Sequence, residues 1–332
     1  MEIKAADVAK LRKMTGAGMM DCKKALVEAE GDFNRAQEII REKGKLVAAK
    51  RSDRETSEGA VVVRLNADNT QAVIVCLGCE TDFVSKNEEF QNLVKAIADV
   101  AIAALPASKD ELLACKMGEG TVQDAITQQT GKSGEKHQLV YYAKLEAAYI
   151  SSYVHTINGK LGAIVAFNKP VPAELGKGVA MQVVSMNPVS VAAADCPAAV
   201  VENERQVAIE KTKEEQVSKA VDAALKKAGI NPAHCDSEDH IESNTAKGWL
   251  TPEQAAQARE IKKTVAEQKA ASLPAAMIEN IVKGRIQKFF KENTLEEQEY
   301  QMGDGKASVK ETIAAADKDA KVLSFFRASL ND

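Results

Sequence analysis

The sequence has few aromatic residues and no long apolar run. Aromatic side chains make up 4% of its 332 residues, and tryptophan occurs once. Scarce aromatics beside abundant alanine and charged residues favour a chain rich in helix. No apolar run approaches the roughly 18 residues of a membrane span, and the amino-terminal MEIKAADV has no apolar signal-peptide core. These absences predict a cytoplasmic protein without a membrane partner.

The chain also lacks an excess of positive charge. Its net charge is −4 at pH 7 and its isoelectric point is near 5.8, whereas a general nucleic-acid binder ordinarily has an isoelectric point above about 9. We therefore expect a protein partner and no direct nucleic-acid partner. With 45% hydrophobic residues, the chain can form a sizeable core and is long enough for two or three domains.

Signatures of covalent chemistry are missing as well. The sequence has no nucleophile elbow, H-E-x-x-H motif or dinucleotide fingerprint. Gly131-Lys132-Ser133 is similar to the end of a phosphate-binding loop, but the required first glycine is replaced by Ile126. The six cysteines are scattered, which argues against a disulfide framework. We predict a protein that is not an enzyme and has no cofactor or metal.

Two short patterns leave alternatives open. Cys76 and Cys79 have the CxxC spacing of a redox pair or of half a zinc site. Residues three apart on a strand face opposite sides, so a structural role is preferred, and a low thiol pKa would be needed to support an oxidoreductase. His234, Cys235 and His240 could form a surface metal site, although a polar loop with incidental histidines is the preferred interpretation.

The stretch CLGCETDFVSKNEEF, from Cys76 to Phe90, holds the main candidate site. The residues before it favour a strand. Ser85 and Glu88 have the S-x-x-E spacing of a capping box, so a helix is expected to begin just after Phe83. Because nothing obvious buries Asp82 or Phe83, this acid and aromatic pair is predicted to form an exposed wedge. In the alternative interpretation, Phe83 plugs the corner between strand and helix, and Asp82 is solvated or caps the helix.

The first 45 residues predict a small three-helix module. Its apolar residues recur at helical spacing in three short runs. Asp32 is expected to be the N-cap of the third helix and Gly44 its stop. Residues 46–58 are polar and of mixed charge, which predicts a solvated linker.

The middle of the chain predicts an α+β fold. Two β-rich runs, from Gly59 to Leu65 and from Gln71 to Cys79, predict a hairpin, and Ile157-Asn158-Gly159 predicts the turn of a second hairpin. Helical spacing follows each of them, which indicates two related core subdomains. These are expected at residues 59–148 and at residues 149–197 with 284–332.

Residues 198–283 predict a protruding antiparallel helical coiled-coil hairpin. The first half is alanine-rich with a thin apolar seam. The second helix is expected to open at Thr251-Pro252-Glu253-Gln254, a T-x-x-Q cap with proline at the first helical position. The segment between them, from Gly229 to Lys247, is expected to be polar and mobile.

Two long motifs, in this order, resemble a known family. TGAGMMDCKKALVEAEGDFNRA is similar to the ubiquitin-associated-like module of bacterial translation elongation factor Ts, and CETDFVSKNEEF is similar to the core signature of that family. The resemblance continues through YVHTINGKLGAIVAF and KGRIQKFF and fades between about residues 215 and 270. The helical projection is longer here than in the shorter relatives.

The resemblance implies a guanine-nucleotide exchange factor. Such a factor binds elongation factor Tu and loosens its GDP and magnesium so that GTP can enter during translation elongation. Carried onto matching positions, the resemblance implies an exchange wedge formed by Thr81, Asp82, Phe83 and Val84. It also implies further partner contacts by Met19, Met20, Asp21, Lys23, Gly134 and His155.

The residues alone leave a second class of function open. A non-catalytic adaptor could use the small helical module and the coiled coil to tether protein partners without acting on nucleotide. The helical hairpin could also mediate self-association. A nucleotide-release assay separates the exchange factor from the adaptor.

Overall fold

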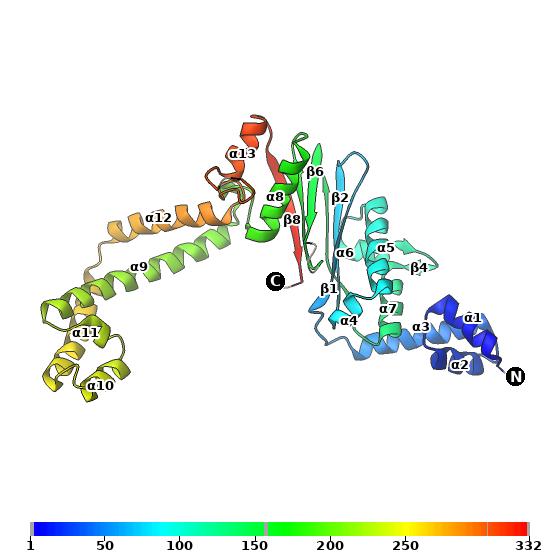
Figure 1. The fold of residues 1–332 in the computed structure, drawn as a ribbon, viewed down its shortest axis with the longest axis horizontal. Helices are drawn as coiled ribbons and strands as arrows, with labels where there is room; N and C mark the ends of the chain where they lie inside the picture. The colour runs from blue at the N-terminus through cyan, green and yellow to red at the C-terminus, as the bar shows by residue number, and fades with distance from the viewer. Residues whose placement is uncertain (1–2, 156–158, 304, 331–332) are drawn as a thin grey trace. The chain divides into compact units, whose positions relative to one another are not determined.

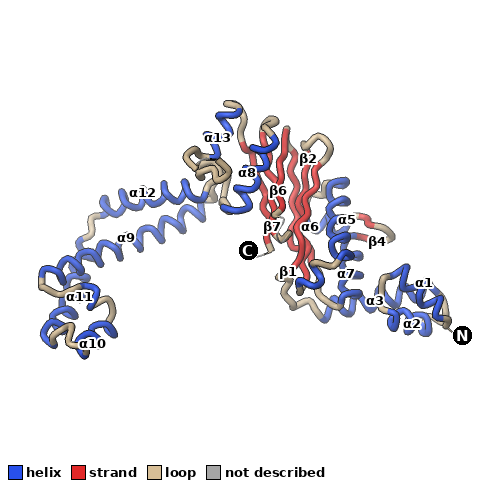
Figure 2. The backbone as a smooth tube through the Cα atoms, in the orientation of Figure 1, coloured by secondary structure: helices blue, strands red, loops and turns tan. Residues whose placement is uncertain are grey.

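The computed structural model describes residues 3–155, 159–303 and 305–330 (Figure 1). The chain divides into two compact units: unit 1 comprises Met1–Val191 and Leu295–Asp332, and unit 2 comprises Ala192–Thr294. The described part of unit 1 contains both helices and antiparallel sheets, whereas unit 2 is built of helices (Figure 2). The predicted α+β fold class is therefore confirmed.

The amino-terminal part of unit 1 is a bundle of three helices. These are α1 (Ala5–Thr15), α2 (Met19–Glu28) and α3 (Phe33–Lys50). Asp32 caps α3 as predicted, because its carboxylate accepts the backbone N–H groups of the first turn. The bundle has its own buried apolar cluster, which includes Leu11, Cys22, Leu26 and Ala36.

The third helix does not stop at Gly44, so that prediction is wrong. α3 continues to Lys50 and packs along α7 (Val122–Ser133), where Gly44 meets Gly131. A Cβ atom built on Gly131 would lie 2.9 Å from the Cα atom of Gly44, so glycine permits the close approach of the two helices. Gly44 is a helix contact here, and the polar segment predicted as a linker begins inside a helix.

Two three-stranded antiparallel sheets form the body of unit 1. The first sheet has the order β1-β2-β5 and the second the order β6-β7-β8. Both predicted hairpins, β1–β2 and β6–β7, are paired, although the turn residues at 156–158 lie outside the described residues. The strands are β1 (Glu58–Leu65), β2 (Gln71–Cys79), β5 (Gln138–Glu146), β6 (Tyr149–Val154), β7 (Leu161–Phe167) and β8 (Val322–Ser329).

The two sheets pack face to face, and helices cover their outer faces (Figure 1). Side chains alternate along β2, so Ile74 and Cys76 enter the cluster between the sheets, while Val75 and Leu77 face α5 (Glu88–Ala104) and α7. The second sheet is covered by α8 (Ala173–Met186) and α13 (Val309–Ala316). The remaining short elements of this unit are α4 (Asp82–Ser85), α6 (Lys109–Ala114), β3 (Lys116–Met117) and β4 (Gly120–Thr121).

Unit 2 is organised along the long helix α9 (Ala198–Lys227). Its second half packs against α11 (Pro252–Ser272), which opens at the predicted capping box of Thr251 and Gln254. Its first part packs against α12 (Ala275–Asn293), and ion pairs of 2.8 Å between Arg205 and Glu279 and of 2.7 Å between Arg285 and Glu215 join the two helices as far as the middle of α9. The predicted pairing of the first and second helices therefore covers only part of α9.

The segment between α9 and α11 is folded, in contrast to the polar and mobile loop that was expected. It contains η2 (Pro232–His234) and α10 (Glu238–Ala246). Ile230, Cys235 and Ile241 are buried in one cluster with residues of α9 and α11. These apolar residues are too widely spaced to show a helical period, so only the tertiary contacts reveal the core that they form.

The described residues can also be searched for membrane-spanning helices and for metal sites. Within the ranges given above, no helix is both long and apolar enough to cross a membrane. Over the same ranges, histidine, cysteine and acidic side chains do not gather in threes where they could hold a metal ion, and this includes the suggested group around Cys235.

Candidate functional site

The candidate wedge lies where β2 gives way to helix. Thr81 caps the short helix α4, and its hydroxyl accepts the N–H of Val84 at 3.5 Å. α5 then starts separately, with Asn87 as its cap. The predicted capping box of Ser85 and Glu88 is therefore wrong: Ser85 is buried, and its hydroxyl donates to the Asp82 carbonyl at 3.0 Å.

Phe83 is the most exposed large apolar side chain among the described residues, with 84% of its surface accessible. Because of this exposure, Phe83 does not plug the corner between strand and helix. Its neighbour Val84 packs against the core instead. Asp82 forms an ion pair of 2.7 Å with Lys86, and this hydrogen bond holds the pKa of Asp82 below its usual value. The predicted exposure of Phe83 is confirmed, while its role as a wedge stays a prediction.

The turn before Phe83 is joined to a distant segment by two carboxylates, one from each segment. Glu135 accepts the Thr81 N–H at 3.0 Å and the Thr81 hydroxyl at 2.6 Å. In return, Glu80 accepts the Lys136 backbone N–H at 2.6 Å. Each segment therefore supplies one carboxylate that binds the backbone of the other. We call the pair of Glu80 and Glu135 the carboxylate clamp.

The end of α3 forms the third side of this arrangement. Arg51 donates to both carboxylate oxygens of Glu80 at 2.9 Å, and the Lys136 ammonium donates to the carbonyl groups of Ser52 and Arg54 at 2.7 and 2.9 Å. Burial raises the pKa of Glu80, but the hydrogen bonds from Lys136 and Arg51 lower it by more, so the pKa lies below its usual value. Two segments that are distant in sequence, the end of α3 and the loop after α7, thus hold one turn.

A buried histidine, His137, contacts the backbone of the clamp residue Glu135. His137 Nδ1 lies 2.9 Å from the Glu135 carbonyl and 3.3 Å from the Thr130 hydroxyl, and its ring packs against Phe90. Burial lowers the pKa of His137 below 6.5, although the carbonyl and carboxylate of Glu135 oppose this change. A neutral imidazole that donates from Nδ1 therefore fits the site at neutral pH.

Two of the other predicted contact residues lie at the same end of the two sheets as Phe83. Gly134 ends α7 in a left-handed conformation and immediately precedes Glu135 of the clamp. His155 follows β6, where its N–H donates to the Leu161 carbonyl at 2.8 Å and its Nδ1 lies 3.1 Å from the Tyr153 hydroxyl. β7 is tied to this end because Lys160, just before Leu161, forms an ion pair of 2.5 Å with Glu58.

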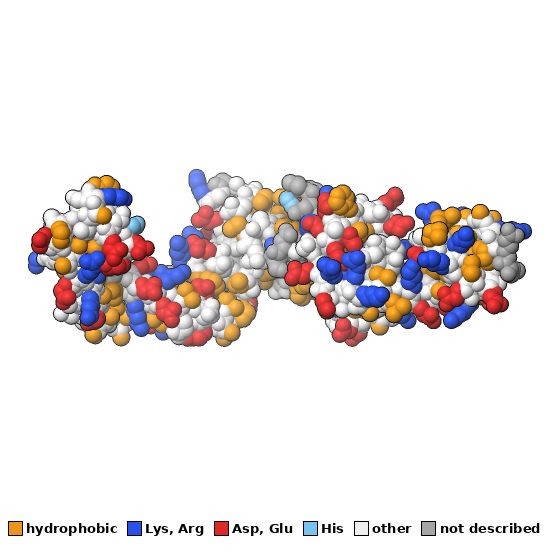
Figure 3. Space-filling view, turned by 90° about the horizontal axis from the view of Figure 1, so that it is seen from below, with side chains coloured by type: hydrophobic (Ala, Val, Ile, Leu, Met, Phe, Trp, Pro, Cys, Tyr) orange, Lys and Arg blue, Asp and Glu red, His pale blue; other side chains and the backbone are white. Residues whose placement is uncertain are grey.

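The predicted contact residues of the bundle form a separate surface. On α2, Met19, Met20 and Lys23 are exposed, whereas Asp21 is ion-paired with Lys43 of α3. Hydrophobic side chains lie among cations on the visible face of the bundle (Figure 3). We call Met19, Met20 and Lys23 the α2 surface.

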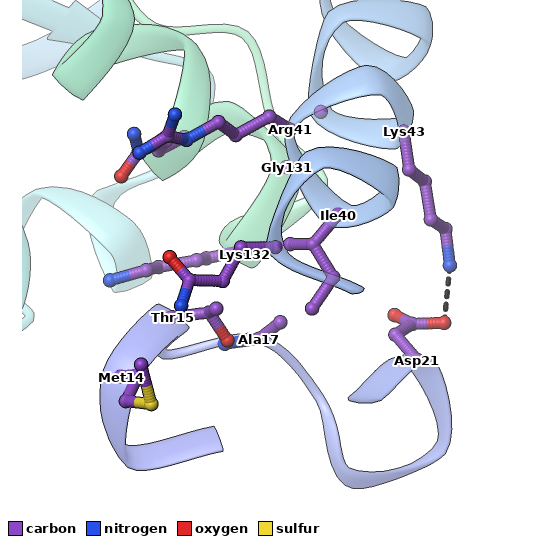
Figure 4. A pocket seen from close by; sticks show the side chains of 12 residues that line it. Met14, Thr15, Ala17, Asp21, Ile40, Arg41, Lys43, Gly131 and Lys132 are labelled. Atoms are coloured by element: carbon purple, nitrogen blue, oxygen red, sulfur yellow. Dashed lines mark hydrogen bonds and ion pairs between the residues drawn. The ribbon is translucent and has the colours of Figure 1, made fainter. Parts of the chain in front are cut away.

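A pocket lies between the bundle and α7, and Asp21 of α2 is among the residues that line it. In Figure 4 the Asp21–Lys43 ion pair stands at one side of it, and Lys132 extends from α7 toward the turn between α1 and α2. There the Lys132 ammonium lies against Gly16, whose left-handed backbone and missing Cβ leave room for it. This packing, with the contact of Gly44 and Gly131, fastens the bundle to α7.

The two cysteines of the CxxC pattern lie on opposite faces of β2, as predicted. Cys76 is buried between the sheets, and Cys79 is buried under α5. Burial raises the pKa of each thiol to about 12. A redox pair needs a thiol of low pKa, so the structure contradicts the oxidoreductase interpretation and supports the structural one.

Sequence reasoning found Phe83 and its neighbours but missed the residues that hold them. Glu80 and Glu135 lie directly beside predicted site residues, yet no local pattern joins positions that are more than 50 residues apart. The sequence places Arg51 in the predicted solvated linker. Only the fold brings these side chains together.

Comparisons with known proteins identify the family to which the chain belongs. A family model described as Elongation factor TS matches residues 80–332. The chain is similar to elongation factor Ts of Phocaeicola vulgatus, with 54% identity over 330 residues and 99% of each chain covered. It is also similar to elongation factor Ts of Bacteroides thetaiotaomicron, with 53% identity over 330 residues and the same coverage. That of Flavobacterium johnsoniae is 45% identical over 302 residues, which cover 90% of this chain and 88% of the relative. Since the identity extends over nearly the whole length, the chain belongs to the elongation factor Ts family.

Proposed function

We propose that this protein is a guanine-nucleotide exchange factor that binds elongation factor Tu and promotes release of GDP with its magnesium, so that GTP can rebind. Membership of the elongation factor Ts family supports a role in translation elongation. The observation that carries the finer proposal is the Phe83 side chain, 84% exposed on a turn fixed by hydrogen bonds from Thr81. A side chain presented on an ordered turn can enter a gap in a partner at a low entropic cost.

The proposed activity needs preferential binding to one state of the partner. A factor that weakens GDP binding must itself bind the GDP form more weakly, by the same coupling free energy. Each tenfold loss of nucleotide affinity requires about 1.4 kcal/mol of preference for the empty state. Full burial of a phenylalanine is worth about 1.5–3 kcal/mol, so Phe83 alone accounts for roughly one or two factors of ten.

A larger effect needs further contacts, and the structure offers candidates for them. We propose that Thr81, Asp82 and Val84 act with Phe83, and that the α2 surface, Asp21, Gly134 and His155 supply additional binding. Gly134 and His155 lie at the same end of the sheets as Phe83, and the α2 surface is separate and exposed. No bond is made or broken in this mechanism; the factor acts through binding alone.

The decisive experiment measures release of labelled GDP from purified elongation factor Tu, with and without this chain. We expect faster release when the chain is present. If the chain binds but leaves release unchanged, the adaptor is the correct function. If calorimetry shows equal affinity for the GDP-bound and the empty partner, exchange by differential binding is excluded.

A further inference from the structure

The carboxylate clamp gives one residue a role that its position in the sequence does not suggest. We propose that Glu135 is a positioning residue for nucleotide exchange, which holds the Thr81 turn so that Phe83 stands exposed in the conformation that the partner binds. This inference rests on the exchange function proposed above. Glu135 comes from the loop after α7 and reaches the turn through two hydrogen bonds, to the N–H and the hydroxyl of Thr81.

The Thr81 hydroxyl connects Glu135 with the helix that carries Phe83. It donates to Glu135 at 2.6 Å and accepts the N–H of Val84 at 3.5 Å. The contact with Glu135 therefore orients the oxygen that caps α4. A helix of four residues has no stability of its own, so its conformation depends on this cap and on the packing of Val84.

The exposure of Phe83 makes such a restraint necessary. A phenylalanine with 84% of its surface in water would lower its free energy by folding back onto apolar surface, and the conformation of the turn opposes this. When the turn is fixed before the partner arrives, binding does not have to order it. Loss of the restraint should therefore weaken the productive encounter, even though Phe83 itself is unchanged.

Glu135 is better placed for this role than the other half of the clamp. Glu80 is ion-paired with Arg51 and binds the Lys136 backbone, so its loss would also free the end of α3. The Glu135 carboxylate is half-buried, and its hydrogen bonds given above both go to Thr81. Its removal should leave the sheets and their helices folded and affect mainly the turn.

The test uses the full chain and compares Glu135→Ala and Glu135→Gln with the wild type in the GDP-release assay. The glutamine variant keeps the shape and one acceptor oxygen but turns an amide N–H₂ toward one donor of Thr81. We expect about a tenfold lower rate of factor-stimulated release for the alanine variant and a smaller loss for glutamine. Glu111→Ala is the matched control, because Glu111 also accepts a backbone N–H, that of Ala107, but lies away from the turn. It should release GDP like the wild type.

A double-mutant cycle separates positioning from general damage. If Glu135 acts only through Phe83, adding Glu135→Ala to Phe83→Ala should change the release rate no further. Additive losses from the two substitutions would show that Glu135 acts elsewhere and would overturn the proposal. Unchanged release with Glu135→Ala alone would overturn it as well.

Amide hydrogen exchange in the free protein supplies a readout that does not depend on the partner. Glu135→Ala should speed exchange at the amides of Thr81 and Val84, while the amides of β1 and β2 keep their protection. Unchanged protection at Thr81 and Val84 would contradict the restraint itself. If the wild-type chain fails to stimulate GDP release while the amide result holds, it is the proposed exchange function that fails, and Glu135 orders the turn for another purpose.

Discussion

The two most exposed large aromatic side chains among the described residues, Phe83 and Trp249, are exposed for different reasons. Phe83 is 84% exposed and Trp249, the single tryptophan, is 61% exposed. Trp249 follows α10. Its backbone N–H donates to the Asn244 carbonyl at 2.9 Å, and Gly248 before it has a left-handed backbone conformation. This is the usual ending of a helix. The Trp249 ring also lies 5.5 Å from the His234 ring, and the Lys247 ammonium is 5.3 Å from its centre.

Phe83 has a different setting. The turn that carries it is held through its own Glu80 and Thr81 by Arg51 at the end of α3 and by Glu135 and Lys136 after α7, two segments far from it in sequence. The position of Trp249, next to the His234 ring and the Lys247 ammonium, therefore follows from the local ending of a helix. The position of Phe83 depends on contacts with distant segments of the fold. The comparison teaches that exposure alone does not mark a binding residue; long-range contacts that fix an exposed side chain are a stronger indication.

The largest expected effect tests this comparison directly. Phe83→Ala should slow factor-stimulated GDP release by roughly tenfold to a hundredfold, because the burial of one phenylalanine in a partner is lost. Trp249→Ala should change release by less than about twofold, a free-energy difference under about 0.4 kcal/mol. Both variants should keep the wild-type circular dichroism spectrum. Equal losses from the two substitutions would remove the distinction between these aromatics.

The second prediction compares glycines in the two units. Gly131→Ala should lower the free energy of unfolding by about 1–3 kcal/mol, because the new methyl group would press on the Gly44 backbone of α3. Gly284→Ala is the matched control within α12. A Cβ there meets open space, and alanine in place of a helical glycine should stabilise by about 0.5–1 kcal/mol. Urea unfolding followed by circular dichroism measures both; a neutral Gly131→Ala would show that α3 and α7 can separate.

A smaller effect should appear as pH falls. Burial lowers the pKa of His137 from the usual 6.5, so below about pH 6.5 the unfolded chain binds a proton that the folded chain does not. The unfolding free energy contributed by this residue is therefore complete above that pH and decreases as the pH falls toward the folded pKa.

His137→Asn tests the sign of this pH dependence. An asparagine amide can keep a donor near the Glu135 carbonyl but does not titrate. The variant should lose less stability than the wild type between pH 7.5 and 5.5, measured by urea unfolding at both values. Parallel losses in the two proteins would place the effect on other groups.

The smallest expected effect concerns unit 2. Deleting Lys211 to Ser272 removes the second half of α9 together with α10 and α11 but keeps the pair of Arg205 and Glu279. Because Phe83, the clamp and the α2 surface all belong to unit 1, GDP release should change by less than about twofold. Sedimentation should instead show altered self-association. Loss of GDP release from a folded variant would mean that unit 2 contributes to exchange.

Much of the secondary structure follows from the sequence because its causes are local. The cap at Asp32, the capping box of Thr251 and Gln254, and the paired β-rich runs all depend on residues a few positions apart. The exposure of Phe83 could be predicted for the same reason, since it falls outside the apolar period of the helix that follows. The opposite orientations of Cys76 and Cys79 follow from the alternation of a strand.

Tertiary structure decided the features whose causes are distant. Gly44 looks like a helix stop until Gly131 lies against it, and the segment from Gly229 to Lys247 looks polar until α9 and α11 cover its few apolar residues. Likewise, Glu80 and Glu135 are ordinary surface carboxylates in the sequence, and only the fold pairs each with the backbone of the other's neighbour. A hydrogen bond or a close packing contact needs both partners within a few ångströms, and local patterning carries no record of a partner 50 residues away.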